Sequence, residues 1–206
     1  MSKVAHVIGN GDMAQMYKPA KGIKVTCNIP PFQVNNVFAT AIVDFKMCAA
    51  IKEGSVTVPG DWVAGFRPQM WCQKYPDFYM KYAPQIKEFY TVLPKYAIFK
   101  GQTSGQGYTN FNCGHMATHW VANKLKATEI HLYGFDSIFD FTLRSYTDLV
   151  LNSDRGNTNN NRLINNWRPI WNGIFAEFKN TQFVLYHRHA EAKIPLPKNV
   201  EVRTKN

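Results

Sequence analysis

Residues Val4–Gln15 read VAHVIGNGDMAQ, and this stretch decides the fold. The mostly apolar run Val4–Ile8 predicts a buried strand, Gly9–Gly11 predicts a turn, and Asp12–Tyr17 predicts a helix. Glycine permits positive φ and lets a ligand approach the backbone, and the N-terminus of a helix offers N–H groups to a phosphate. The stretch therefore indicates either a phosphate-binding turn or a turn whose glycines serve only packing.

Strands and helices alternate along the rest of the chain. Further strands are expected at Ile23–Cys27, Phe38–Val43, Trp62–Phe66, Tyr96–Phe99, Glu129–Tyr133 and Phe183–Tyr186. Helices are expected at Phe45–Ile51, Pro84–Tyr90, Cys113–Lys126 and Arg162–Lys179. This alternation predicts an α/β fold with a doubly wound, mainly parallel, Rossmann-like sheet. In such sheets ligands bind beyond the carboxyl ends of the strands.

The length of 206 residues fits a single domain, residues 1–206. Proline, tyrosine and lysine crowd residues 67–95, which predicts a small irregular lobe. The glycine-rich residues 101–111 are expected to form a polar loop. Residues 137–162 end in an asparagine-rich stretch that is typical of a lid beside a site.

Composition narrows the class of protein. No apolar run reaches the roughly 20 residues that a membrane span needs, and the N-terminus lacks the layout of a signal peptide, so we expect a cytoplasmic protein. None of the four cysteines lies at zinc-ligand spacing, so no metal site is expected. The formal net charge of +10 favours a polyanionic partner such as nucleic acid.

Polar side chains follow three of the expected strands. Asn28 could bind a base or a sugar, or form an Asx turn before Pro30. Asp44 could act as a general base or cap the helix that follows it. Asp136 stands just past a strand and therefore near the ligand crevice. A dinucleotide site is not indicated, because the G-x-G-x-x-G fingerprint is incomplete and no acidic residue ends the second strand.

Residues Thr109–Trp120 read TNFNCGHMATHW and predict a second helix start. Asn110 or Asn112 could cap this helix, and the glycine at position 114 leaves room for a ligand close to its first turn. Two histidines lie four residues apart, but the glutamate of the zinc motif H-E-x-x-H is absent. A histidine that is packed or that faces a ligand is therefore favoured over a zinc ligand.

These segments, in this order, resemble a known family. VIGNGDM, TCNIPPF and NCGHMATHWVANKLKATEIHLYGFD look like the bacterial sialyltransferases of Campylobacter type and related Rossmann-like proteins of the DUF115 kind. The match extends from residue 4 to about residue 178. The resemblance implies a variant of the GT-A fold and a glycosyltransferase that uses a nucleotide-sugar, UDP- or CMP-linked, without a metal ion. The chain also lacks the Asp-x-Asp pair that holds a cation in other glycosyltransferases.

The resemblance also implies roles for particular residues. Donor binding would fall to Gly9, Asn10, Gly11, Asp12, Asn28, Asn112, Cys113, Gly114, Asp136, Arg144 and Tyr146. Arg144 or Tyr146 would balance the charge of the leaving group. The family's catalytic histidine, before the last long helix, is missing from this chain. We therefore expect Asp44 to act as the base, with His115 as the second candidate.

The acceptor is predicted from charge and motif layout. The chain is similar to small phage glycosyltransferases that modify hydroxymethylcytosine, including the arabinosyl-adding kind, which implies a DNA acceptor and the host cytoplasm. Aromatic side chains of the lobe could receive a flipped base or could simply pack the lobe: Trp62, Phe66, Trp71, Tyr75 and Tyr79. The alternatives are a saccharide acceptor, a non-catalytic nucleotide- or nucleic-acid-binding protein, and a methyltransferase, whose usual G-x-G-x-G turn is not met.

Overall fold

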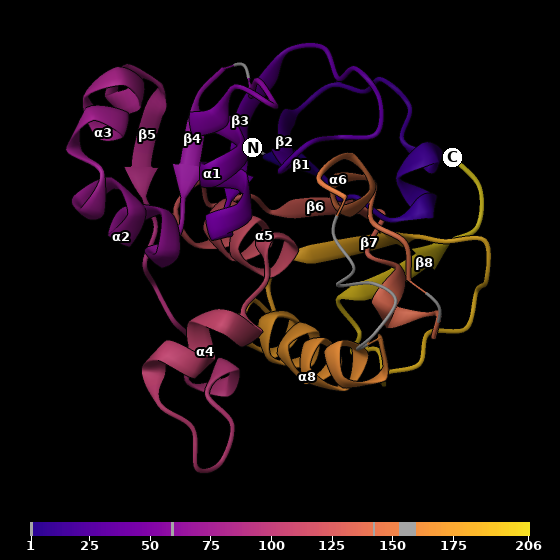
Figure 1. Ribbon diagram of the computed structural model, residues 1–206. Helices are drawn as coiled ribbons and strands as arrows, with labels where there is room; N and C mark the ends of the chain where they lie inside the picture. The colour runs from indigo at the N-terminus through magenta and orange to yellow at the C-terminus, as the bar shows by residue number, and fades with distance from the viewer. Residues whose placement is uncertain (1, 59, 142, 153–159) are drawn as a thin grey trace.

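The computed structural model describes residues 2–58, 60–141, 143–152 and 160–206, with the backbone alone for 160–164. Eight parallel strands form one sheet in the order β5-β4-β3-β2-β1-β6-β7-β8 (Figure 1). The strands are β1 Val4–Ile8, β2 Ile23–Cys27, β3 Val37–Ile42, β4 Trp62–Ala64, β5 Ile86–Phe89, β6 Glu129–Tyr133, β7 Gln182–Tyr186 and β8 Val200–Arg203. This confirms the predicted α/β class with a doubly wound sheet, which is wholly parallel in the described residues.

The strand order contains a switch point beside β1. The chain winds outward from β1 to β5, then crosses back and places β6 on the other side of β1. Ile8 at the end of β1 pairs with Thr26 of β2 and with Tyr133 of β6, so three strand ends lie at one level. The connections after β1 and β6 run to opposite sides of this point, which opens a crevice beyond the strand ends. Ligands bind in such crevices in doubly wound proteins.

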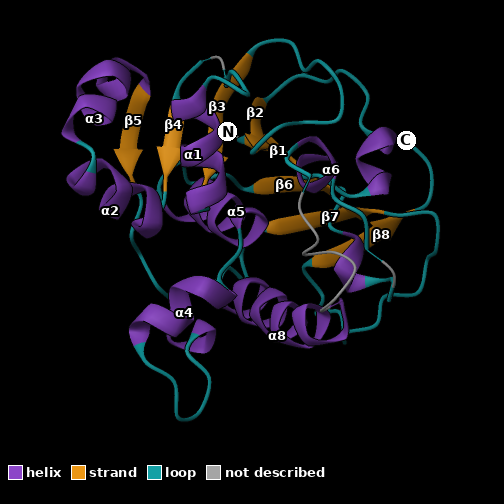
Figure 2. Cartoon of the chain, viewed as in Figure 1, coloured by secondary structure: helices purple, strands orange, loops and turns teal. Residues whose placement is uncertain are grey.

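Helices cover both faces of the sheet (Figure 2). They are α1 Phe45–Glu53, α2 Phe66–Lys74, α3 Pro76–Tyr82, α4 Ser104–Asn110, α5 Cys113–Asn123, α6 Tyr146–Val150 and α8 Asn160–Glu177, with the short 3-10 helices η1 Asp12–Met16, η2 Ala83–Gln85, η3 Lys95–Ala97 and η4 Asp136–Ile138. Helix α5 packs on β1, β2 and β3, and α8 packs beside it. Among the described residues, no helix has the length and apolarity that crossing a membrane requires.

The two faces of the sheet carry separate cores, as expected from the period of two along a strand. Trp120 of α5, together with Trp171 and Phe175 of α8, is almost fully buried in the larger core. On the other face, α1, α2 and α3 bury a second core that includes Trp62 and Phe78. Burying each of these large side chains contributes about 2–3 kcal/mol, so α5 and α8 are held firmly against the sheet.

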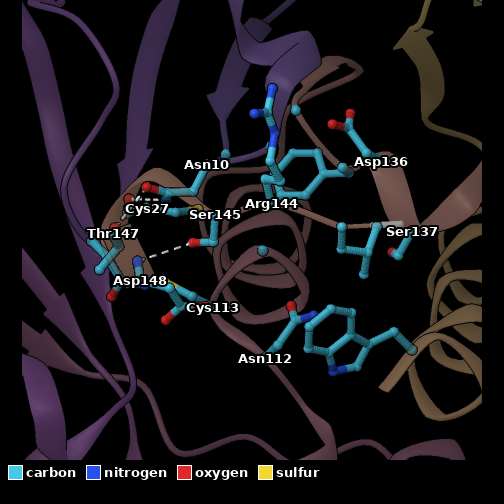
Figure 3. A pocket seen from close by; sticks show the side chains of 18 of the residues that line it. Asn10, Cys27, Asn112, Cys113, Asp136, Ser137, Arg144, Ser145, Thr147 and Asp148 are labelled. Carbon is cyan, nitrogen blue, oxygen red and sulfur yellow. Dashed lines mark hydrogen bonds between the residues drawn. The ribbon is translucent and has the colours of Figure 1, made fainter. Parts of the chain in front are cut away.

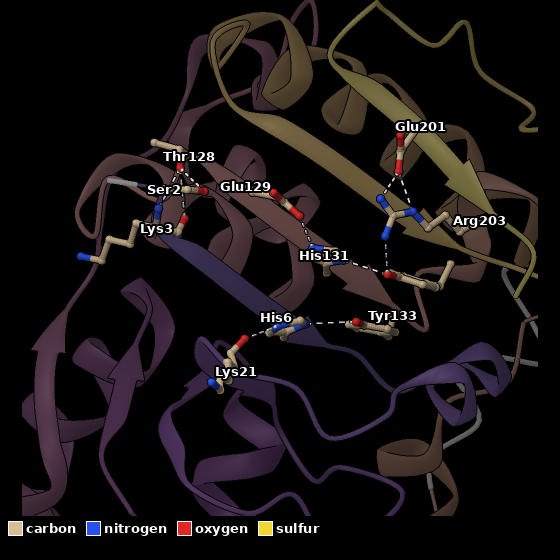
Figure 4. A network of polar contacts seen from close by, with 11 residues as sticks. Ser2, Lys3, His6, Lys21, Thr128, Glu129, His131, Tyr133, Glu201 and Arg203 are labelled. Atoms are coloured by element: carbon tan, nitrogen blue, oxygen red, sulfur yellow. Dashed lines mark hydrogen bonds and ion pairs between the residues drawn. The ribbon is translucent and has the colours of Figure 1, made fainter. Parts of the chain in front are cut away.

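A polar layer underlies the ends of β1 and β6 on the face away from α5 (Figure 4). His6 Nε2 donates to the Lys21 carbonyl (3.0 Å), so its Nδ1 accepts from the Tyr133 hydroxyl (3.0 Å). On the next strand pair, His131 lies 2.9 Å from the Tyr186 hydroxyl and stacks on His6, with ring centroids 4.8 Å apart. Burial lowers the pKa of His6, which favours its neutral ring.

The predicted lobe and its neighbours differ from expectation. Residues 67–95 are largely regular: they hold α2, α3 and β5, and the predicted helix at Pro84–Tyr90 is strand β5, paired with β4. The predicted strand at Tyr96–Phe99 is wrong, because its first two residues belong to the short helix η3, and β8 is a strand that we did not predict. Pairing with a neighbouring strand decided β5 and β8, and local sequence does not encode that pairing.

The glycine-rich residues 101–111, predicted as a loop, contain helix α4. Thr103 accepts from the backbone N–H of Gln106, and the Gln106 side chain accepts from the N–H of Thr103 (2.9 Å), which forms a capping box. Gly107 is required there, because a Cβ at this position would lie 2.7 Å from Ile98. Packing and capping therefore override the low helix propensity of glycine.

Candidate functional site

A pocket of about 150 Å³ lies at the switch point, beyond the carboxyl ends of β1, β2 and β6 (Figure 3). Ten of the residues predicted from the sequence line it: Gly9, Asn10, Gly11, Asn28, Asp44, Asn112, Cys113, Gly114, Asp136 and Arg144. Three predicted residues do not line it: Asp12, His115 and Tyr146. The turns after β1, β2 and β6 and the start of α5 thus meet at one place.

The Gly9–Gly11 turn fits tightly against the turn after β6. Gly9 N–H donates to the Tyr133 carbonyl (2.7 Å), and Gly11 N–H donates to the Gly134 carbonyl (3.0 Å). A Cβ at Gly11 would lie 2.5 Å from Asp136 Oδ2, and one at Gly9 would lie 2.8 Å from the Phe135 ring. The close packing of the two turns that form the pocket therefore explains these glycines, which is the second of the two alternatives that the sequence left open.

Asn10 ties the walls of the pocket together. Its Nδ2 donates to the Cys27 carbonyl (2.6 Å), its Oδ1 accepts from the Thr147 hydroxyl (2.6 Å), and its carbonyl accepts from the N–H of Tyr146 (3.0 Å). The side-chain amide thus has a partner at each end. Asn10 joins β2 to α6, which forms one side of the pocket, and its role is to position those walls.

Asn28 presents an acceptor that the described residues do not use. Its backbone is left-handed (φ 52°), its N–H donates to the Ala41 carbonyl (2.9 Å), and its Oδ1 is buried without a hydrogen-bond partner among the described residues. An Asx turn would need the N–H two residues on, but Pro30 has none. The Asx alternative therefore does not account for this side chain, and a ligand donor would.

The start of α5 is held by a capping box between Asn112 and His115. Asn112 Oδ1 accepts from the N–H of His115 (2.9 Å), and His115 Nδ1 accepts from the N–H of Asn112 (3.1 Å). The N–H groups of Cys113 and Gly114 belong to the first turn, whose amides have no acceptor within the helix. Because both residues line the pocket, these amides and the helix dipole favour an anion there.

Cys113 is a packed thiol at the floor of the pocket. Its S–H donates to the Ala41 carbonyl (3.0 Å), and burial raises the pKa of the thiol well above its usual value, with Cys27 acting in the same direction. The neutral thiol is a poor nucleophile. Its place at the first position of α5 fits the predicted contact with a donor through the backbone.

His115 lies behind the pocket and not in it. The side chain is 0% exposed, packs edge-on to Trp171 (4.8 Å), and uses its Nδ1 to cap α5. Burial lowers the pKa of His115 to about 3. This corrects our expectation of His115 as the second candidate base, because Nδ1 already accepts from the Asn112 N–H, Nε2 of the neutral ring therefore carries the proton, and the ring does not line the pocket.

Asp44 forms an ion pair at the pocket wall. Its Oδ1 lies 2.9 Å from Nη2 of Arg67, and both side chains are 16% exposed. Asp44 stands at the N-cap position of α1, but its side chain makes no capping hydrogen bond. The capping alternative is therefore not observed. A ligand that contacts the Asp44 carboxylate would also lie beside the guanidinium of Arg67.

Arg144 and its neighbours form the outer rim. The Arg144 guanidinium pairs with Asp12 Oδ2 (Nη2 at 3.0 Å, Nε at 3.2 Å), and the arginine side chain is 69% exposed. An exposed pair of this kind is worth less than about 1 kcal/mol, so a phosphate can displace it readily. Tyr146 contributes its backbone N–H to Asn10, and its ring does not line the pocket.

Other pocket residues escaped the sequence reasoning. They include Lys46, Ser145, Thr147, Asp148, Trp167 and Trp171. Trp167 and Trp171 lie four residues apart on α8, and both reach the pocket from that helix. Lys46 follows the strand-end residue Asp44 by two positions, which is a signal that could have found it.

No family model, curated protein or solved structure matches this chain. In the described part of the chain, no group of three or more His, Cys, Asp or Glu side chains could hold a metal ion.

Proposed function

We propose that this protein is a glycosyltransferase that takes a sugar from a UDP- or CMP-linked donor and works without a metal ion. The observation that carries the proposal is that Asn28, Gly114 and Asp136 line one pocket at the switch point, beside the Gly9–Gly11 turn. The amides at the start of α5 suit the phosphate of such a donor. The unused acceptor Asn28 Oδ1 suits a hydroxyl group of its sugar or ribose.

The proposed acceptor is a hydroxymethylated cytosine in DNA, as in phage DNA modification. The net charge of +10 supports a polyanionic acceptor. Phe45, next to Asp44 in the sequence, is 41% exposed but does not line the pocket, and its ring centroid lies 6.4 Å from that of Trp71, so charge alone supports this acceptor.

The lobe aromatics do not contribute to this proposal, because they pack against other aromatic rings. Trp62 stacks on Tyr82 (5.1 Å) and Phe66 on Tyr108 of α4 (4.3 Å), whereas Trp71 lies tilted against Tyr75 (4.4 Å) and Tyr79 against Phe89 (6.2 Å). None of the five lobe aromatics lines the switch-point pocket. The packing alternative therefore accounts for them.

The direct test is product formation. UDP-, CMP- and GDP-sugars are incubated with hydroxymethylated DNA, plain DNA and a simple saccharide, in the presence of EDTA, and sugar transfer is followed by mass spectrometry. We expect transfer to hydroxymethylated DNA alone, with retention on DNA that weakens as salt rises. Transfer to the saccharide alone would favour the saccharide-directed alternative. Absence of transfer with all donors would contradict the proposal.

A thermal-stability panel separates the classes of function. UDP, CMP or GDP at 100 times its dissociation constant should stabilise the protein by about 2.7 kcal/mol, whereas a methyltransferase would respond to S-adenosylmethionine. A nucleotide that stabilises the protein without any turnover of its sugar would indicate a non-catalytic binding protein.

Asp44→Asn tests the base that we predicted from the sequence. If Asp44 takes the proton, the variant should lose roughly 100-fold or more in turnover of the nucleotide-sugar while its melting curve in the absence of ligand stays cooperative. The measurement is release of nucleotide over time. Unchanged turnover would remove Asp44 from the mechanism.

A further inference from the structure

The turn after β6 places one buried carboxyl group at the point where the turns of β1 and β6 part. Asp136 is 7% exposed and lines the pocket. Its Oδ2 accepts from the N–H of Met13 (3.3 Å), whereas Oδ1 is buried and has no hydrogen-bond partner among the described residues. A buried acceptor without a partner costs free energy, so a ligand hydroxyl that donates to Oδ1 would remove that cost.

The surroundings of Asp136 favour proton uptake. Burial is the main cause that raises its pKa, to about 6; hydrogen bonds from the backbone of Met13 and Asp12 act against this rise, and the carboxylates Asp140 and Asp12 add to it. Asp12 is itself paired with Arg144, and Asp140 with His187 (3.0 Å). Each nearby carboxylate therefore has a cation or a ring N–H of its own. A carboxyl group that titrates near neutral pH suits proton transfer better than one that titrates near 4.

We propose that Asp136 is the general base of the reaction and takes the proton of the acceptor hydroxyl, a role that rests on the function proposed above. Asp44, by contrast, is held by the guanidinium of Arg67 at 2.9 Å. In that ion pair the Asp44 carboxylate is already bound by a cation, whereas Oδ1 of Asp136 has no hydrogen-bond partner among the described residues. Asp44 then positions the acceptor or the wall of the pocket.

The step balances as a single displacement. The O–H bond of the acceptor breaks and its proton passes to Oδ1 of Asp136, while the hydroxyl oxygen bonds to the anomeric carbon of the sugar. The bond from that carbon to the phosphate oxygen breaks, and its electron pair leaves with the nucleotide. The first-turn amides of α5 stabilise the charge on the departing phosphate.

The test is the pH dependence of kcat/KM and kcat for Asp136→Asn. For the wild type we expect kcat/KM to rise with pH through an acid limb near pH 6. The variant should lose about 100-fold or more in kcat, keep KM for the nucleotide-sugar within about threefold, and lose the acid limb. Asp136→Glu, which keeps the carboxyl group, should recover part of kcat and restore an acid limb.

Asp140→Asn is the matched control, since it neutralises a neighbouring carboxylate that does not line the pocket. It should retain kcat and move the acid limb to lower pH, an effect that a merely structural role of Asp136 would not produce. If Asp136→Asn kept the kcat and the acid limb of the wild type, Asp136 would not be the base. The same would follow if the acid limb were lost in Asp44→Asn alone. If the wild type turned over none of the nucleotide-sugars, the proposed function would fail as well.

Discussion

Gly114→Ala is expected to destabilise the protein by about 1–2 kcal/mol and to weaken nucleotide binding at least tenfold. Alanine normally favours a helix over glycine by up to about 1 kcal/mol, but here a Cβ would overlap the Phe135 ring, whose Cδ1 lies 2.8 Å away. Overpacking costs about 1–3 kcal/mol. The ring is also held by Trp171 (5.1 Å) and lines the pocket, so any shift of the ring changes the shape of the site.

Gly105→Ala is the matched control for this substitution. Gly105 lies in α4, and the nearest atom to an added Cβ is Thr103 Oγ1 at the ordinary distance of 3.7 Å. This variant should be neutral or up to about 1 kcal/mol more stable, with unchanged binding. Urea unfolding and nucleotide titration measure both effects. Equal stability and equal affinity in the two variants would show that the α5–Phe135 contact does not shape the site.

The second large effect is a pH-dependent gain in stability from Asp136→Asn. Burial raises the pKa of Asp136 from 3.8 to about 6, so the folded state binds this proton more tightly than the unfolded state does. The wild type therefore loses stability from this group as pH rises from well below 3.8 to well above 6, by about 3 kcal/mol in total. Asparagine does not ionise, so the variant avoids that loss.

Unfolding free energies at pH 4 and pH 8 test this expectation. The variant should gain about 2.5 kcal/mol relative to the wild type between the two pH values. Asp61→Asn serves as the control, because Asp61 is an exposed partner of Lys87 and lies outside the pocket. A difference between wild type and Asp136→Asn that does not change with pH would contradict the buried, proton-binding state of this carboxyl group.

The central strands and the site could be predicted because their signals are local. Apolar runs mark β1, β2 and β6, and each is followed by glycine or a short polar residue, as in Gly9, Asn28 and Gly134. Parallel strands bring such ends to one edge of the sheet. Order along the chain was therefore enough to place ten candidate residues around one pocket.

The remaining features depend on contacts that are distant in sequence. His115 stands one position from a pocket residue, yet the helix turns it toward Trp171, and only packing reveals this. Asn10 looked like a donor ligand but is bound by Cys27 and Thr147, which is 137 residues away. The four residues of β5 mix polar and apolar side chains, a pattern that fits a helix as well as a strand. Pairing with β4 determines that they form a strand.

Calorimetric titration with nucleotide tests the central claim most directly, that the turns after β1, β2 and β6 form one donor site. We compare the wild type with Asn28→Gly, which removes the amide but keeps the left-handed backbone that residue 28 needs. With EDTA present, the wild type should bind UDP or CMP at one site per chain, and Asn28→Gly should bind about tenfold more weakly. A wild type that releases no heat with any nucleotide, or equal affinity in both proteins, would contradict a donor site formed by these three turns.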